Sequence, residues 1–243
     1  MKNLLLLAAQ NKHLPKHFSA KATEAKDAVN IHMYGIFDAD FGLNAADLVA
    51  ALPEGDTPVN IFLNSPGGDV FEARAMAALI ARHAGPVTMT VDGLAASAAT
   101  YFALSGSKVQ ATEGSLFMVH NSWTWTFGNK HDLTTTAQLL DKVDGTIAAD
   151  YARKTGASAE QIAAWMDAET WFSAQEALDN KFLDAILPSS QTGIADRAKW
   201  NLSAYKNAPK IASPKDEGPT VEQLISQQRN RNVARAALLE FSV

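Results

Sequence analysis

The sequence contains no cysteine among its 243 residues. This absence excludes disulfide bonds, thiolate metal ligands and a cysteine nucleophile, and it fits a reducing compartment. The chain also has no Gly-Lys pair followed by serine or threonine, which is the phosphate-binding sequence of common ATPases. We therefore expect that the chain does not hydrolyse ATP by itself.

Long apolar runs and a surplus of basic residues are missing as well. The N-terminal apolar stretch covers only Leu4 to Ala9, whereas a secretory signal has an apolar region of about 7–15 residues and a membrane span needs roughly 18. The formal net charge of −5 and the lack of a basic stripe argue against nucleic-acid binding. The sequence predicts a cytoplasmic protein with no membrane or nucleic-acid partner.

Short apolar, β-branched segments alternate along the chain with helical patterns. Predicted strands cover 29–36, 59–64, 87–92, 108–111 and 116–119, and predicted helices cover 43–53, 69–85 and 95–106. Such alternation indicates βα units and an α/β fold. After residue 130 the pattern becomes helical, with a long periodic segment at 132–156, two helices begun by capping boxes at Ser158 and Ser173, and a closing strand at 182–187.

Three regions follow from this organisation. Residues 1–28 are expected to form a mobile or docking N-terminal arm, residues 29–190 the main domain, and residues 191–243 an appendage. Prolines and a glycine in the appendage indicate a flexible linker over about 189–219. A capping box at Thr220 then predicts a final amphipathic helix, for which partner binding, self-cleavage and docking on the core are open alternatives.

The hexapeptide Asn-Ser-Pro-Gly-Gly-Asp at 64–69 follows a predicted strand. A plain turn needs one glycine at most, so two in succession indicate backbone N–H groups facing something that a Cβ would block. A tight turn before a helix is an equally good interpretation of the hexapeptide alone.

Ser97 lies among four alanines at the start of a predicted helix. It is either the N-cap of that helix or a nucleophile whose oxyanion is stabilised by the N–H groups at the helix start. A nucleophilic serine needs a base. His120 follows the predicted strand 116–119, so it emerges where α/β folds place functional side chains. A strand-end histidine without a catalytic role is the alternative.

A serine–histidine pair needs an acceptor for the second imidazole nitrogen, usually a carboxylate. Asp167, Glu169 and Glu176 are available in the segment that follows the helix begun at Ser158. The capping box at Ser173 already accounts for Glu176. Asp167 and Glu169 are the two candidates, in a loop expected to fold back toward His120.

Four segments occur in one order: NSPGG at 64–68, GLAAS at 93–97, MVH at 118–120 and FSAQEALDNKFLDAIL at 172–187. Together they resemble the Clp-type serine peptidases, and most closely the phage and prophage ClpP-like head-maturation proteases. The resemblance covers roughly residues 29–190. It implies a ClpP/crotonase-like α/β fold of repeated β-β-α units with a long handle-type helix, to which this chain adds a C-terminal extension.

The resemblance implies a catalytic triad of Ser97, His120 and Glu169, with Asp167 as the alternative acid. Glu169 stands at the position where the family usually has aspartate. The implied reaction is hydrolysis of peptide bonds by a serine endopeptidase.

By the same resemblance, the N–H groups of Gly68 and Ala98 form the oxyanion hole, although methionine is common in the family at the position of Ala98. No metal and no cofactor are implied. The implied partners are a polypeptide substrate, other copies of the chain in a homo-oligomeric ring, and either phage capsid or scaffold proteins or an ATP-dependent unfoldase.

Two other classes of function stay open at this point. A crotonase-fold acyl-CoA enzyme also uses paired backbone N–H groups for an oxyanion, but it needs a glutamate acid/base and no serine–histidine pair. A non-catalytic assembly subunit with an idle site is the second alternative, and no feature of the sequence argues for it.

Overall fold

The computed structural model describes residues 4–11, 14, 16–188 and 200–209. Its strands are β1 (His17–Ala22), β2 (Val29–Tyr34), β3 (Val59–Ser65), β4 (Val87–Ala96), β5 (Lys108–Thr112), β6 (Leu116–Val119), β7 (Thr170–Ser173) and β8 (Ala185–Leu187). Its helices are α1 (Leu4–Asn11), α2 (Ala45–Ala51), α3 (Val70–Arg82), α4 (Ala98–Ala103), α5 (Lys130–Thr155), α6 (Ala159–Asp167) and α7 (Ala174–Asp179).

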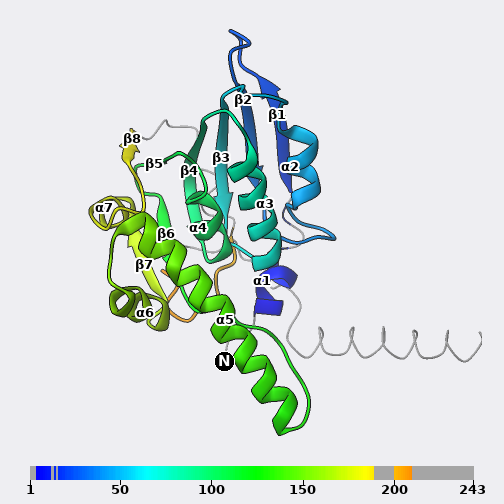
Figure 1. The fold of residues 1–243 in the computed structure, drawn as a ribbon, viewed down its shortest axis with the longest axis vertical. Coiled ribbons are helices and arrows are strands. Elements are labelled where there is room, and N and C mark those ends of the chain that lie inside the picture. The colour runs from blue at the N-terminus through cyan, green and yellow to red at the C-terminus, as the bar shows by residue number, and fades with distance from the viewer. Residues whose placement is uncertain (1–3, 12–13, 15, 189–199, 210–243) are drawn as a thin grey trace, which may run out of the picture.

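These strands form one eight-stranded sheet (Figure 1). The order is β1-β2-β3-β4-β5-β8, and β6 pairs with both β4 and β7 beside this path. Pairing is parallel except at β1 and β7, which run antiparallel to β2 and β6. The carboxyl ends of β3, β4 and β6 therefore meet at one edge of the sheet, which is where parallel α/β sheets usually carry their functional residues.

Strand β4 is the longest strand, and it has two partners on one side. Its first half pairs with β5, and its second half pairs with β6, where Ala96 is in register with Met118. The residues that follow these two positions are thereby brought close together. This register is what brings Ser97 and His120 to one place.

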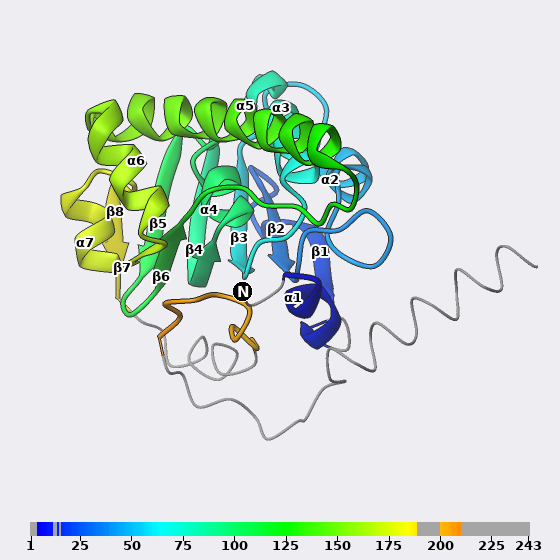
Figure 2. The same cartoon turned by 90° about the horizontal axis from the view of Figure 1, so that it is seen from below.

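The helices are distributed unequally over the two faces of the sheet. Figure 2 shows α3, α4 and α5 on one side, with α1 and residues 200–209 on the other. The main core lies between the sheet and the first group, and it includes Ile61, Met76, Phe102 and Phe117. A smaller apolar cluster on the opposite face combines α1, the ends of β4 and β6, and residues 200–208.

Most elements lie where the sequence predicts them, and the α/β fold is confirmed. Strands β2 to β6 and helices α2 to α7 correspond to the predicted segments, with helix ends shorter by one to three residues in several cases. The difference at β4 is larger, because this strand continues to Ala96, into the start of the helix predicted at 95–106. The strand predicted at 182–187 is reduced to β8. The helix predicted at Thr220 lies outside the described residues.

Two features of the chain ends differ from the sequence-based expectation. Residues 1–28 were expected to form a mobile or docking arm before a domain that starts at residue 29, but β1 pairs with β2 over six residues and is part of the sheet. Residues 200–209 fall inside the expected linker, yet Trp200, Leu202 and Tyr205 are each at most 8% exposed. Both segments are thus packed onto the domain. In the described part of the chain, no helix is both long and apolar enough to cross a membrane.

Candidate active site

Ser97 occupies the turn between β4 and α4 in a backbone conformation that side chains other than glycine rarely adopt. Its φ is 58° and its ψ is −125°, and its side chain makes no capping hydrogen bond to the helix. Ser97 thus stands at the N-cap position of α4, but its side chain does not act as the cap. Such a conformation costs of the order of 1–3 kcal/mol, and it is typical of sharp strand-to-helix turns that present a nucleophilic serine.

Hydrogen bonds donated by Ser97 and Thr100 hold this turn in place. The N–H of Ser97 donates to the carbonyl of Met118 at 2.9 Å. The hydroxyl of Thr100, which is fully buried, lies 2.6 Å from the carbonyl of Ala95 and 2.7 Å from that of Met118. The turn is thus fixed to β6 at Met118, which lies two residues before His120.

His120 follows directly after β6, and its side chain faces Ser97. The distance between His120 Nε2 and Ser97 Oγ is 2.7 Å. In the tautomer with hydrogen on Nδ1, Nε2 accepts the proton of the serine hydroxyl, which is the arrangement that a general base requires. The sequence-predicted pair is therefore brought into hydrogen-bonding contact.

Burial lowers the pKa of His120 to about 4, and the negative charge of Glu169 counteracts this shift only in part. An imidazole with such a pKa is neutral at pH 7 and free to accept a proton. The other groups that face it are the hydroxyl of Ser97 and the edge-on ring of Tyr205.

The two candidate acids have different surroundings. Asp167, the last residue of α6, accepts a hydrogen bond at 2.7 Å from Asn121 Nδ2 in an exposed position. Glu169 has a φ of 50° and accepts hydrogen bonds from the N–H groups of Lys206 at 2.9 Å and Asn207 at 2.6 Å. Only Glu169 acts on the pKa of His120, although within the described residues neither carboxylate is hydrogen-bonded to that ring.

The glycine pair at the end of β3 lies against the same turn. Gly67 has a φ of 92°, and a Cβ on it would lie 2.5 Å from the carbonyl oxygen of Ala96 and 3.0 Å from Ser97 Cβ. Gly68 has a φ of 142°, and a Cβ there would overlap the carbonyl oxygen of Phe37. The two glycines are thus needed for a close approach of three backbone segments, and not for a turn alone.

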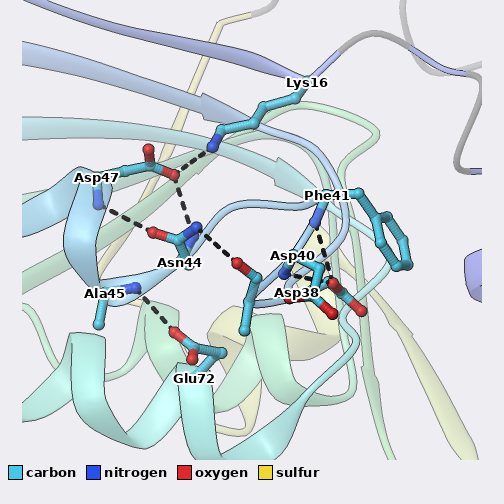
Figure 3. A network of polar contacts seen from close by, with 9 residues as sticks. Lys16, Asp38, Asp40, Phe41, Asn44, Ala45, Asp47 and Glu72 are labelled. Carbon is cyan, nitrogen blue, oxygen red and sulfur yellow. Dashed lines mark hydrogen bonds and ion pairs between the residues drawn. The ribbon is translucent and has the colours of Figure 1, made fainter. Parts of the chain in front are cut away.

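The loop after β2 anchors the glycine pair. The N–H of Phe37 donates to the carbonyl of Gly67, and the N–H of Asp69 donates to the carbonyl of Phe37, both at 2.8 Å. Figure 3 shows the polar network that holds this loop, formed by Lys16, Asp38, Asn44, Asp47 and Glu72 with neighbouring backbone groups. Here Asn44 and Asp47 form the capping box of α2.

A cavity of about 420 Å³ opens in front of Ser97 and His120. Gly68 and Ala98 line it, as do apolar residues of the 123–151 region, including Trp123, Trp125, Leu139 and Tyr151. The N–H of Ala98 belongs to the first residue of α4, where helical N–H groups have no intrahelical acceptor. No glutamate is found among the described residues that line the cavity.

Sequence reasoning missed the residues that lie behind His120. The ring of Tyr205 packs edge-on against the His120 ring with centroids 5.5 Å apart, and its hydroxyl donates to the carbonyl of Pro66. The available signal was the spacing of apolar residues in "WNLSAY" at 200–205, between polar neighbours. The polar composition around it favoured the linker interpretation.

The depressed pKa of His120 predicts an unusual pH dependence of any reaction in which it is the base. Activity needs the neutral imidazole, so kcat/KM should fall as the pH drops through about 4, instead of near the ordinary histidine value of about 6.5. The measurement is the rate of hydrolysis of a fluorogenic peptide from pH 3.5 to 8, with circular dichroism to verify folding at each pH. An acid limb at pH 6.5 in folded protein would contradict the prediction.

Comparison with known proteins identifies the family. The model of the Clp protease family matches residues 35–190. The chain is 35% identical to ATP-dependent Clp protease proteolytic subunit 1 of Chlamydia abortus over 134 residues, which are 54% of this chain and 70% of that protein. It is 28% identical to the subunit 1 of Leifsonia xyli subsp. xyli over 145 residues, or 59% and 74% of the two chains.

A third relative extends this pattern to another organism. The ATP-dependent Clp protease proteolytic subunit of Streptococcus pneumoniae is 29% identical over 136 residues, which are 54% of this chain and 69% of that protein. The family match includes the positions of both glycines, Ser97, His120 and Glu169, and it ends before residues 200–209. The chain belongs to the Clp protease family of peptidases.

Proposed function

We propose that the chain is a serine endopeptidase in which Ser97 is the nucleophile and His120 the general base. The observation that carries this proposal is the contact of 2.7 Å between His120 Nε2 and Ser97 Oγ, at a serine whose side chain does not cap its helix. The family supports peptide-bond hydrolysis as the chemistry.

The proposed mechanism has two steps. Ser97 Oγ attacks the carbonyl carbon of the scissile bond while His120 Nε2 takes the hydroxyl proton, and the C=O electron pair moves to the oxygen. The N–H groups of Gly68 and Ala98 donate to that oxyanion. Collapse breaks the C–N bond, His120 protonates the leaving amine, and water then hydrolyses the acyl-enzyme by the same route in reverse.

Glu169 is the proposed acid of the site. Its negative charge favours the imidazolium that forms when His120 takes the proton, which is consistent with its effect on the pKa of His120. The bound substrate is an extended polypeptide that pairs with the backbone beside the glycine pair. A side chain of this substrate next to the scissile bond enters the cavity, and the aromatic and aliphatic residues that line the cavity favour an apolar side chain.

The experiment that tests this function is labelling with a fluorophosphonate, followed by peptide mapping. We expect a single modified serine, Ser97, and loss of labelling in the Ser97→Ala and His120→Ala variants. The same preparation should degrade a loosely folded protein such as casein without added metal. Modification at another serine would contradict the proposal. So would a preparation that reacts with the fluorophosphonate but does not hydrolyse the protein substrate.

A homo-oligomeric ring is a further part of the proposal. Helix α5 and the segment leading into it expose large apolar side chains, namely Trp123, Trp125, Phe127, Leu133 and Leu139, with Phe127 79% exposed. Exposed apolar groups so close together favour contact with another copy of the chain. Light scattering at micromolar concentration should give a multiple of the chain mass, and Phe127→Asp should lower it. A fully active monomer would contradict this part.

Two cellular settings are compatible with this chemistry. The curated relatives are named as proteolytic subunits of ATP-dependent proteases, which supports pairing with an ATPase. The sequence resemblance to phage head-maturation proteases supports action on capsid or scaffold proteins. Cleavage of a folded substrate without any nucleotide would favour the second setting, because no unfoldase is then required.

A further inference from the structure

Residues 200–209 lie outside the region that matches the family, yet they pack against the candidate site. Figure 2 shows this segment in orange beside the strand ends, near α1. Trp200, Leu202 and Tyr205 form an apolar cluster with Leu7 of α1 and Met118 of β6. Burial of two aromatic rings by a ten-residue segment is a large apolar contribution for its length.

Specific polar contacts fix the position of the segment. The side-chain amide of Asn11 donates to the carbonyl of Asn201 at 2.9 Å and accepts from its N–H at 2.8 Å. Trp200 Nε1 donates to Asn64 Oδ1 at 3.0 Å, and both side chains are buried. Asn64 belongs to β3, three residues before Gly67, so this bond joins the segment to the strand that carries the glycine pair.

Tyr205 contacts two parts of the site. Its ring packs edge-on against His120, and against Trp171 with centroids 5.7 Å apart. Its hydroxyl donates to the carbonyl of Pro66, directly before the glycine pair. Burial raises the pKa of Tyr205, and the neighbouring Ser97 hydroxyl lowers it only in part, so the phenol stays protonated and keeps its donor.

The next two residues hold Glu169. Their N–H groups donate one hydrogen bond to each oxygen of the carboxylate, and Trp171 Nε1 adds a third at 3.3 Å. Asn207 Nδ2 also donates to the carbonyl of Ala168 at 2.7 Å. Charge-assisted bonds of this kind fix a carboxylate strongly. One lone-pair direction of the carboxylate is left over for another donor.

The segment leaves the cavity in front of Ser97 open. None of its described residues lines that cavity, whereas Gly68, Ser97 and His120 all do. A segment that lies behind the base and the acid, and not in the path of a substrate, is arranged to support the site and not to block it.

We propose that residues 200–207 complete the catalytic site from outside the family domain: Tyr205 positions the His120 ring and the loop at Pro66, and the N–H groups of Lys206 and Asn207 position Glu169. This inference rests on the proposed peptidase function. Tyr205 acts through His120 and not on the substrate, so it is a positioning residue.

The first test replaces Tyr205 in the full-length chain. Because a misplacement of about 1 Å costs about 100-fold in rate, we expect Tyr205→Ala to lower kcat about 100-fold and Tyr205→Phe about 3- to 10-fold. KM should change less than about threefold, since the segment does not line the cavity. Tyr34→Phe is the matched control, because it removes a tyrosine hydroxyl bonded to Asp92 away from the site.

A pH profile separates positioning from general loss of structure. In Tyr205→Ala, water reaches the imidazole, so the acid limb of kcat/KM should move upward by at least about one pH unit toward the ordinary histidine value. Glu169 is the charged group that acts on the pKa of His120, and it stays in this variant. Asp167 and Asp144 also stay, bound to Asn121 Nδ2 and to the N–H of Ser122.

A second pair of variants tests the backbone donors. Lys206→Pro removes the N–H that donates to Glu169, whereas Lys206→Ala keeps it, and the side chain of Lys206 is exposed. We expect kcat to fall about tenfold or more only in the proline variant.

The outcomes distinguish this inference from the proposed function. If the wild-type protein is no more active than Ser97→Ala, the proposed function is refuted, and this inference is refuted with it. If wild type is active, but the folded Tyr205 and Lys206 variants keep its kcat and its acid limb, only the inference is wrong. Higher activity in Tyr205→Ala would also overturn it, because the segment would then be inhibitory. Melting temperatures of all variants verify that they are folded.

Discussion

Replacing Ser97 by alanine is expected to lower kcat about 10⁵- to 10⁶-fold, as loss of a serine nucleophile does in other serine peptidases. The remaining groups still bind substrate, so KM should stay within a few-fold of the wild-type value. Initial rates on a fluorogenic peptide, with enzyme concentrations adjusted over several decades, provide the measurement. A loss of less than tenfold would mean that Ser97 is not the nucleophile.

The glycine variant at the same position is a control for folding and strain. Both Ser97→Ala and Ser97→Gly remove the hydroxyl, so both should be equally inactive. Only glycine adopts the observed φ of 58° and ψ of −125° without strain. Ser97→Gly should therefore unfold at a higher temperature than Ser97→Ala, with a difference in free energy of about 1 kcal/mol. Thermal unfolding by circular dichroism measures it.

The sequence predicts the parts of this site that follow from local patterns. The strands predicted to end at Asn64, Asp92 and Val119 are recognisable because each is short, β-branched or apolar, and bounded by glycine or polar residues. The carboxyl end of an α/β strand is where His120 was expected, whereas the resemblance to the Clp-type serine peptidases grouped it with the glycine pair and Ser97. Their contact depends on the register of β6 on β4, which no local pattern specifies.

The sequence gives weaker guidance where tertiary contacts decide the structure. Strand β1 reads "HFSAKA", which is too polar to predict a strand, and it is stabilised as an edge partner of β2. Strand β7 is only four residues long and ends at Ser173, where the capping box begins. The capping box predicted the start of a helix, and no strand was predicted before it. Docking of Trp200 and Tyr205 depends on a pocket formed by α1 and β6, distant in sequence.

The identity of the acid is the part of the site that the sequence leaves most open. Two carboxylates two residues apart both fit the expected loop, and a choice between them needs their hydrogen-bond partners. Asp167 is bound by the side chain of Asn121 at the surface, whereas Glu169 is held by the two backbone donors of the 200–209 segment. These partners favour Glu169, because only a fixed carboxylate stabilises a developing imidazolium at low energetic cost.

Glu169→Gln is accordingly expected to lower kcat about 10²- to 10⁴-fold, in the range seen when the acid of a serine triad is made neutral. The substitution removes the charge that favours protonated His120, and it places an amide donor against the N–H groups of Lys206 and Asn207. Asp167→Asn, the matched control, should change kcat less than about threefold, since its contact with Asn121 is exposed and away from the imidazole.

A conservative variant and a pH profile complete the test of the acid. Glu169→Asp keeps the charge and should be more active than Glu169→Gln. Because the carboxylate raises the pKa of His120, its neutralisation should move the acid limb of kcat/KM further down, opposite to the shift expected for Tyr205→Ala. Near-normal rates in Glu169→Gln together with a large loss in Asp167→Asn would reverse the assignment, and equal, small effects of both would mean that His120 works without a carboxylate partner.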